Sequence, residues 1–224
     1  SQLSKKSVRS FNLMKITKLG HCCLVIEEGG IRMMTDPGSY STLQSEVEGI
    51  DYIFITHEHG DHFHVESLKT VLRNNPKAKI ITNIGVGKLL DEQKIPYELL
   101  ERAGTKYCSG ISVEGCGENH ASVYPGFGGV QNTGYFFANR FFYPGDAFYN
   151  PGKFVEILAL PVSGPWMKIS EAIDYAKLIK PKACFPVHDG MLKFGGPNHV
   201  VPEKLLTPLG IKFEVIKEGE TREF

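Results

Sequence analysis

The sequence predicts an α/β (α+β) protein in which stacked sheets are covered by helices. Short apolar runs ending in polar clusters alternate with amphipathic segments in both halves of the chain. The middle, residues 107–143, is instead rich in glycine, aromatic residues and alternation, which is typical of antiparallel hairpins. Hydrophobic residues make up 42% and charged residues 22% of the chain, as in ordinary globular domains. This combination indicates a layered domain and excludes a disordered, collagen-like or coiled-coil chain.

The predicted elements follow from apolar periodicity and turn residues. Gly29-Gly30 marks a turn between two strands, and Asn74-Asn75-Pro76 ends the first helix. Besides the central hairpins, the expected strands are Met14–Lys18, Cys22–Glu27, Ile31–Thr35, Tyr52–Thr56, Lys79–Thr82, Phe154–Leu160, Ala183–Val187 and Lys212–Ile216. The expected helices are Val65–Arg73, Val86–Gln93, Ile169–Leu178 with Ser170 as N-cap, and a short helix Glu203–Leu206.

No linker or low-complexity tract divides the 224 residues, so residues 14–224 are predicted to form a single domain. Residues 1–13 are polar and basic and are expected to be an N-terminal extension without fixed structure. The chain carries 25 Lys and Arg against 25 Asp and Glu. Such a balance makes a dedicated nucleic-acid binder an unfavoured prediction.

The composition also bears on the compartment. No apolar run approaches the roughly 18–20 residues of a membrane helix, and the N-terminus lacks an apolar signal core. Five cysteines without a CxxC spacing favour free thiols in a reducing compartment. We therefore expect a cytoplasmic protein that does not engage a membrane. The aromatic stretch FFANRFFYPG is compatible with a core or with a homo-oligomeric interface.

The densest chemical signal is the segment THEHGDH, residues 56–62, directly after a predicted buried strand. In an extended conformation His57 and His59 project to one side and can hold one metal ion. Gly60 is expected to allow a sharp turn, after which Asp61 and His62 point at a second metal nearby. The alternative is a solvated polar loop with incidental histidines. The position at the end of a buried strand favours a site.

This segment resembles the signature of the metallo-β-lactamase superfamily. In that family a later histidine, an aspartate and a final histidine complete the motif, each at a strand end. The matching positions are His120 in GENHAS, Asp146 in FFYPGDAFY and His188 in ACFPVHDG. The resemblance runs from about Met14 to His188 and implies a four-layered αβ/βα sandwich.

The resemblance also implies a dinuclear metal site. Its first metal would be bound by His57, His59 and His120, its second by Asp61, His62 and His188, with Asp146 as the bridge. Asp36, in MTDPG, is expected to orient ligands rather than bind metal. We expect two divalent metal ions, Zn²⁺ as first choice, with Mn²⁺ or Fe as alternatives, because all accept imidazole and carboxylate ligands.

The implied chemistry is hydrolysis. Two metal ions about 3.5–4 Å apart hold a bridging hydroxide, because metal binding lowers the pKa of water to about 7. The hydroxide attacks a carbonyl or phosphorus centre, and Asp61 would orient or deprotonate it. No covalent enzyme intermediate is needed. The resemblance therefore implies a metal-dependent hydrolase of a small ester, lactone or phosphate-bearing molecule.

The likeness is greatest to the compact branch that includes ascorbate-6-phosphate lactonase. It is carried by ITKLGHCCLVIEEGGIRMMTDPG, GDAFY and LALPVSGPWMKISEAIDYAKLIKPKACFPVH. The continuation HDGMLKFGGPNH departs from that branch, so the substrate stays open. One alternative is a phosphodiesterase or nuclease, which needs Lys and Arg around the metals. Another is a non-catalytic metal-binding domain.

Five further residues carry two interpretations each. His21, in the first hairpin, either faces the site or is a buried, hydrogen-bonded histidine. Trp166 and Lys168 either hold the apolar and anionic parts of a substrate or pack in the core and face solvent. His64, two residues after His62, could be taken for a ligand but is expected to be a solvated or capping residue. His199 is expected to lie in a surface loop, with a place in the lining of the cleft as the alternative.

Overall fold

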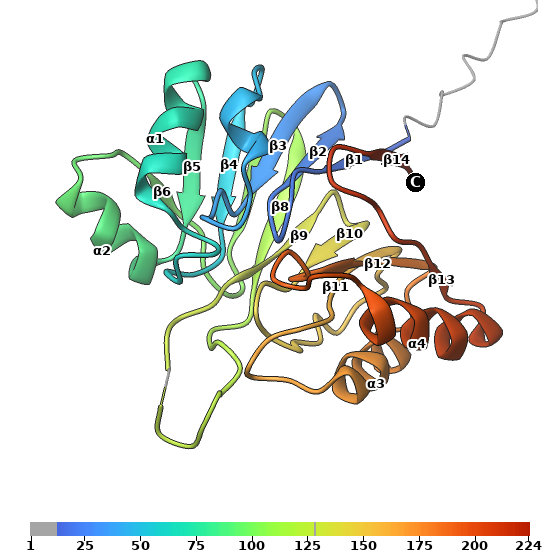
Figure 1. Ribbon diagram of the computed structural model, residues 1–224. Helices are drawn as coiled ribbons and strands as arrows, with labels where there is room; N and C mark the ends of the chain where they lie inside the picture. The colour runs from blue at the N-terminus through green and yellow to red at the C-terminus, as the bar shows by residue number, and fades with distance from the viewer. Residues whose placement is uncertain (1–12, 128) are drawn as a thin grey trace, which may run out of the picture.

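The computed structural model describes residues 13–127 and 129–224 and has four layers: two helices, a sheet, a second sheet and two further helices (Figure 1). This is the αβ/βα sandwich that the sequence predicts. The proposed N-terminal extension lies, but for residue 13, outside the described residues.

The first sheet has the spatial order β14-β1-β2-β3-β4-β5-β6. Its strands are β1 (Lys15–Lys18), β2 (Leu24–Glu28), β3 (Ile31–Thr35), β4 (Tyr52–Ile55), β5 (Lys79–Thr82), β6 (Glu98–Leu99) and β14 (Thr221–Glu223). The pairs from β14 to β3 are antiparallel, and those from β3 to β6 are parallel.

The second sheet has the order β13-β12-β11-β10-β9-β8-β7 and the same division into three antiparallel and three parallel pairs. Its strands are β7 (Thr105–Cys108), β8 (Ile111–Cys116), β9 (Gly134–Phe137), β10 (Phe141–Tyr143), β11 (Ile157–Pro161), β12 (Ala183–Val187) and β13 (Lys212–Phe213). The antiparallel pairs run from β7 to β10, as expected of the hairpin-rich middle.

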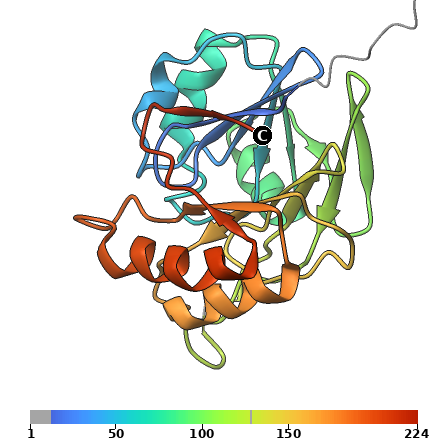
Figure 2. The same ribbon diagram turned by 90° about the vertical axis from the view of Figure 1, so that its right-hand side faces the viewer.

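Helices cover the outer face of each sheet (Figure 2). α1 (Val65–Asn74) and α2 (Ile84–Glu92) lie on the first sheet, and α3 (Ile169–Ile179) and α4 (Gly196–Leu206) lie on the second. Two 3₁₀ turns, Leu43–Glu46 and Thr207–Leu209, complete the helical segments. Three apolar layers result, one between the sheets and one under each helix pair.

The central strands are apolar along their whole length because both of their faces are covered. β11 and β12 are buried at every residue. Between the sheets, the ring of Phe54 on β4 packs edge to face against the rings of Tyr135 and Phe137 on β9. These aromatic contacts fix the spacing of the two sheets and so of the loops at their ends.

Most predicted elements match the structure within two residues, and four predictions are wrong. β13 ends at Phe213, three residues before the expected end at Ile216. α4 begins at Gly196, not Glu203, and continues through Pro202, so His199 lies on a helix instead of in a surface loop. β11 begins at Ile157, because Phe154 is 62% exposed. The N-cap of α3 is Lys168 and not Ser170; the Lys168 backbone N–H donates to the Glu171 carboxylate.

Two short strands escape sequence analysis. β6 and β14 have only two and three residues, and both are mainly polar edge strands. All five cysteines are buried free thiols, as predicted. Within residues 13–127 and 129–224, every helix is too short or too polar to cross a bilayer.

A buried hydrogen bond joins the two sheets. The Tyr143 hydroxyl, on β10, donates to Asp36 Oδ2, 2.6 Å away at the end of β3. A second link runs from the Tyr135 hydroxyl to the carbonyl of Ile55, 2.9 Å away. Both tyrosines are fully buried, so water cannot replace these donors.

Replacing Tyr143 with Phe removes the first link and leaves the buried Asp36 carboxylate one donor short. We expect the free energy of unfolding of the metal-free protein to fall by about 1–3 kcal/mol. Chemical denaturation measures this loss. Tyr107→Phe is the matched control, because Tyr107 is exposed. Equal stability of the two variants would contradict a structural role for the link.

Candidate metal centre

The site lies where the carboxyl ends of parallel strands from both sheets meet. Asp36 follows β3, and residues 57–62 follow β4 in the first sheet. Asp146 follows β10 and His188 follows β12 in the second. Ligand sites gather at such strand ends because the loops there converge.

A first cluster consists of His57, His59 and His120. One nitrogen from each ring lies within 4.8 Å of the others. His120 comes from the long loop after β8, where its backbone N–H donates to the carbonyl of Val130. His57 and His59 thus offer nitrogens to one point, as expected, although the chain bends at residues 58 and 59, and the loop adds the third nitrogen.

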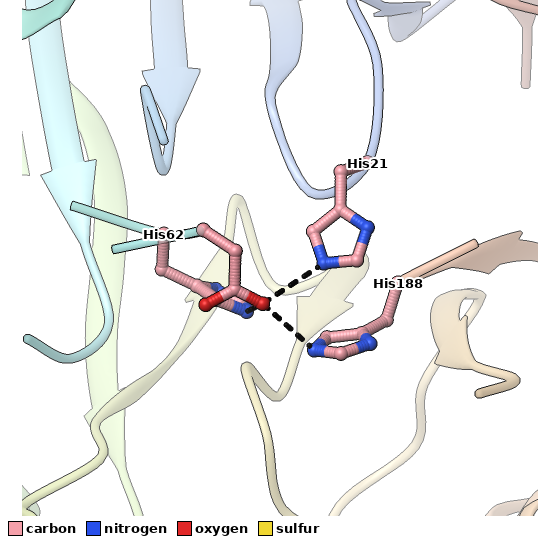
Figure 3. A group of neighbouring side chains, drawn as sticks. His21, His62 and His188 are labelled. Atoms are coloured by element: carbon pink, nitrogen blue, oxygen red, sulfur yellow. Dashed lines mark hydrogen bonds and ion pairs between the residues drawn. The ribbon is translucent and has the colours of Figure 1, made fainter. Parts of the chain in front are cut away.

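A second cluster consists of His21, Asp61, His62 and His188, again with ligand atoms within 4.8 Å of one another. Asp61 Oδ2 lies 3.4 Å from His188 Nε2 and 3.9 Å from His62 Nε2. Figure 3 shows His21, His62 and His188 approaching one another from three separate segments of the chain.

Asp146 lies between the clusters. Its Oδ2 is 3.3 Å from His120 Nε2 and 4.0 Å from His57 Nε2, on the first side. On the second side, Oδ2 is 2.9 Å from His188 Nε2, and Oδ1 is 3.1 Å from His62 Nε2. The structure thus brings together all seven residues named from the sequence as metal ligands.

Hydrogen bonds at the far nitrogens fix how three of these rings are protonated. The Asp36 carboxylate accepts from Thr56 Oγ1 and lies 2.7 Å from His62 Nδ1, which must therefore carry a hydrogen. Thr56 Oγ1 in turn accepts from His57 Nδ1 at 2.9 Å. His120 Nδ1 donates to the carbonyl of Ala121 at 2.5 Å. In the neutral form of each ring, Nε2 therefore has its lone pair facing the centre.

Those inward-facing atoms have no hydrogen-bond partner. The buried atoms concerned are Nε2 of His57, His62, His120 and His188 and Oδ1 of Asp146. Leaving one such atom unpaired costs about 1–3 kcal/mol, so a concentration of them at one point requires an occupant. Imidazole nitrogens and carboxylate oxygens suit Zn²⁺, Mn²⁺ and Fe, and the residues present therefore fit divalent metal ions.

The electrostatics of the cluster agree with that fit. Although burial alone would raise the pKa of Asp146, the neighbouring imidazoles, led by His62, hold it well below its usual value. Burial likewise opposes a charge on His188, but Asp146 and Asp61 outweigh it and raise the pKa of His188 to about 10. Burial holds the pKa of His57 well below its usual value. The carboxylates are therefore ionised, and cations would take the place of protons beside them.

His21 is both buried and directed at the site. Its Nδ1 accepts a hydrogen bond from the backbone N–H of Gly190, so its hydrogen is on Nε2, 3.2 Å from Asp61 Oδ2. Both interpretations of His21 are therefore correct, because the residue faces the site and is also a buried, hydrogen-bonded histidine. In this arrangement His21 donates to a carboxylate and has no lone pair facing the second cluster.

Left-handed backbone occurs at two residues of the site. Asp36 has φ of 36° and His188 has φ of 60°, a region that non-glycine residues rarely adopt. His188 is held there from both sides, because its N–H donates to the carbonyl of His21 and its own carbonyl accepts from the Ser163 hydroxyl. Strain of this kind persists only where the surroundings fix it.

A cleft of about 340 Å³ opens onto both clusters. Its lining residues are Ser39, Tyr40, His59, Gly60, Asp61, His120, Val123, Asp146, Pro165, Trp166, His188 and Met191. Trp166 Nε1 donates to Asp146 Oδ2 at 2.9 Å.

The remaining candidates lie away from the cleft. Lys168 caps α3, exposed and outside the lining. His64 is the N-cap residue of α1 and contacts the Ser67 hydroxyl. His199 pairs with Asp189 at 3.0 Å.

Sequence analysis missed several residues that touch the site. Tyr143 lies in an apolar run like many other residues, and nothing in the sequence indicates its contact with Asp36. Cys22, assigned to core packing, also reaches His62 and Asp146 with its sulfur. Gly38 had a usable signal, since it follows Asp36 in MTDPG. A Cβ there would lie 1.8 Å from the carbonyl oxygen of Asp61, so glycine is required for close approach of the two loops.

Gly60, unlike Gly38, is not required by the structure, although it was expected from the sequence to allow a sharp turn. Its backbone is not in the left-handed region, and an added Cβ would meet nothing within 4 Å. The turn between the two pairs of ligands therefore does not depend on glycine at this position.

Comparison with known proteins identifies the family. Residues 15–188 match the family described as the beta-lactamase superfamily domain. A Mycobacterium tuberculosis protein, Rv0786c, is 34% identical over 184 residues, covering 80% of this chain and 85% of that protein. A UPF0173 metal-dependent hydrolase of Aeropyrum pernix is 27% identical over 249 residues, covering 95% of this chain and 98% of that protein.

Solved structures show the same fold. Igni18, a metallo hydrolase from Ignicoccus hospitalis, superimposes with a TM-score of 0.76 at 20% identity, over 95% of this chain and 98% of that chain. A candidate metal-dependent hydrolase of Parabacteroides distasonis gives a TM-score of 0.74 at 25% identity, over 92% of this chain and 94% of that chain.

Fold, converging imidazoles and these matches define the class: the chain belongs to the metallo-β-lactamase superfamily. Within that superfamily it is a metal-dependent hydrolase.

Gly38→Ala tests the close approach of the two loops. The added methyl group must push the backbone of Asp61 and His62 away, because the nearest atoms are backbone and cannot rotate aside. We expect metal content to fall at least twofold and the free energy of unfolding to decrease by about 1–3 kcal/mol. Elemental analysis and denaturation measure the two effects.

Gly60→Ala is the matched control within the motif itself. Both quantities should stay near wild type, because the space at Gly60 is open. Loss of metal in Gly60→Ala, or full metal content in Gly38→Ala, would contradict this account of the loop.

Proposed function

We propose that the chain hydrolyses a small molecule at a dinuclear divalent metal centre. The observation that carries the proposal is the set of buried, unpaired Nε2 atoms arranged on two sides of the Asp146 carboxylate. Two separate clusters on either side of one carboxylate suit two cations better than one.

The proposed ligand assignment follows the clusters. One metal ion would be held by His57, His59 and His120, and the other by Asp61, His62 and His188. Asp146, within 4.0 Å of ligand nitrogens on both sides, would bridge them. We propose Zn²⁺ first, with Mn²⁺ and Fe as alternatives that accept the same ligands.

When bound, such a pair of cations supplies a water molecule of lowered pKa and a positive charge for a developing oxyanion. The chain's own residues would do the rest. Asp61 lines the cleft, and its ionised carboxylate, oriented by His21, would position the attacking water. Asp36 would keep His62 in the tautomer that offers Nε2. No serine or cysteine nucleophile lies among the residues that would hold the metals.

Small esters, lactones and phosphate-bearing molecules are the substrate classes this chemistry serves. A nuclease or phosphodiesterase is less well supported, because the described cleft lining contains no lysine or arginine to hold a backbone. A purely metal-binding role is also less well supported, because the cleft opens onto both clusters. Hydrolysis of 4-nitrophenyl esters and phosphates, before and after removal of metal with a chelator, tests the proposal. Equal rates in both states would refute it.

Single substitutions test the ligand assignment. His59→Ala and Asp146→Ala should each lower bound metal by at least half and reduce hydrolysis on the order of a thousandfold or more. Each variant loses one proposed metal ligand, and Asp146→Ala loses the carboxylate that would bridge the two ions. Elemental analysis and turnover measure this.

His64→Ala is the control, because His64 is a nearby histidine that only caps α1. It should leave metal content and turnover near wild type. Trp166, the only tryptophan, contacts Asp146, so its fluorescence should respond to metal in wild type and not in Asp146→Ala. Equal losses in His64→Ala and His59→Ala would contradict the assignment.

A further inference from the structure

The wall of the cleft differs in chemistry from its floor. The floor consists of the candidate ligands. The side chains of the wall are mainly apolar, namely Tyr40, Val123, Pro165, Trp166 and Met191. The indole N–H of Trp166 is already taken by Asp146, so this residue offers the cleft only its apolar ring.

The described lining contains no lysine or arginine. Three lysines lie close in sequence to residues of the site. Lys18 is buried and donates to Asp189 and to the carbonyl of Pro186. Lys193 is exposed in the loop that carries Met191 and is not part of the lining. Lys168 caps α3 outside the cleft. Phosphate and carboxylate groups are usually held by an Arg or Lys that can make charge-assisted hydrogen bonds, and this wall supplies none.

Val123 and Met191 form the mouth of the cleft from two different loops. They are 40% and 45% exposed, which leaves apolar area that a ligand would cover. Burying apolar surface contributes about 25 cal/mol per Å², and an unbranched methionine adapts to ligands of different shape. The wall therefore selects for an apolar group and against a charged one.

We propose that the substrate is an uncharged carboxylic ester, open-chain or cyclic, whose apolar acyl part lies against Tyr40, Val123 and Met191. This inference rests on the proposed hydrolase function and narrows its substrate class. In the reaction, a water oxygen bonds to the acyl carbon and the bond from that carbon to the ester oxygen breaks. The leaving oxygen keeps the electron pair and takes a proton from the water, and the carboxylic acid formed releases its proton to solvent.

A substrate series tests the inference on the metal-loaded protein. The probes are 4-nitrophenyl acetate, butyrate and hexanoate, with 4-nitrophenyl phosphate as the charged comparison. We expect kcat/KM to rise on the order of tenfold from acetate to hexanoate, mainly through KM, because each methylene is bound before and during reaction. The phosphate should be turned over at least a hundredfold less efficiently than the hexanoate.

Two variants at one position sharpen the test. Met191→Ala should raise KM for the hexanoate about tenfold while the acetate changes less than twofold. Met191→Lys should shift the ratio of phosphate to hexanoate turnover about tenfold toward the phosphate. Phe194→Ala is the matched control, because Phe194 is exposed in the same loop and does not line the cleft.

Binding without turnover gives an independent measurement. The neutral 4-nitroanilide of hexanoic acid should quench the fluorescence of Trp166 saturably, and 4-nitrophenyl phosphate at the same concentration should not.

The outcomes distinguish the ester assignment from the proposed hydrolase function. Preferred turnover of the phosphate, or equal behaviour of Met191→Ala and Phe194→Ala, would overturn the ester assignment while the metal-dependent hydrolase stands. Absence of turnover of every probe by protein shown to contain metal would overturn the proposed function and this inference with it.

Discussion

The buried Asp36 carboxylate is the contact on which the geometry of the site depends. It accepts hydrogen bonds from the Thr56 backbone and hydroxyl, from His62 and from Tyr143. These donors come from the loop after β4 in one sheet and from β10 in the other. A charge in a fully enclosed position is tolerated only when it is satisfied in this way. The same four bonds therefore hold the motif loop in place and align the two halves.

The imidazoles are oriented by short chains of hydrogen bonds that end in groups unable to donate back. Asp36, through Thr56, reaches His57, and it reaches His62 directly. The carbonyl of Ala121 does the same for His120. Each ring then presents an unprotonated nitrogen to the centre, at the cost of leaving that atom unpaired in the protein alone. The protein therefore arranges these nitrogens as ligands for divalent metal ions.

Much of this arrangement could be predicted from the sequence, because local patterns report local constraints. Residues 56–62 are contiguous, and His120, Asp146 and His188 each follow a recognisable apolar strand. The four layers follow from alternating elements and from the family resemblance. Contacts made across the fold were not predictable: Tyr143 meeting Asp36, or Gly38 meeting Asp61, depends on how two sheets pack. α4 begins at Gly196 and not at the expected Glu203, because the helix continues through Pro202, a residue that usually interrupts helices.

The matching strand order of the two sheets has a consequence for the integrity of the molecule. Each sheet has helices on one face only, and the apolar side chains of its other face pack against the opposite sheet. A polypeptide cut near its midpoint would expose a broad apolar sheet face in each fragment and would divide the histidines of the site between the two fragments. Neither fragment has a route to a soluble, self-sufficient state, and complementation of separately produced fragments would require them to meet while still folding.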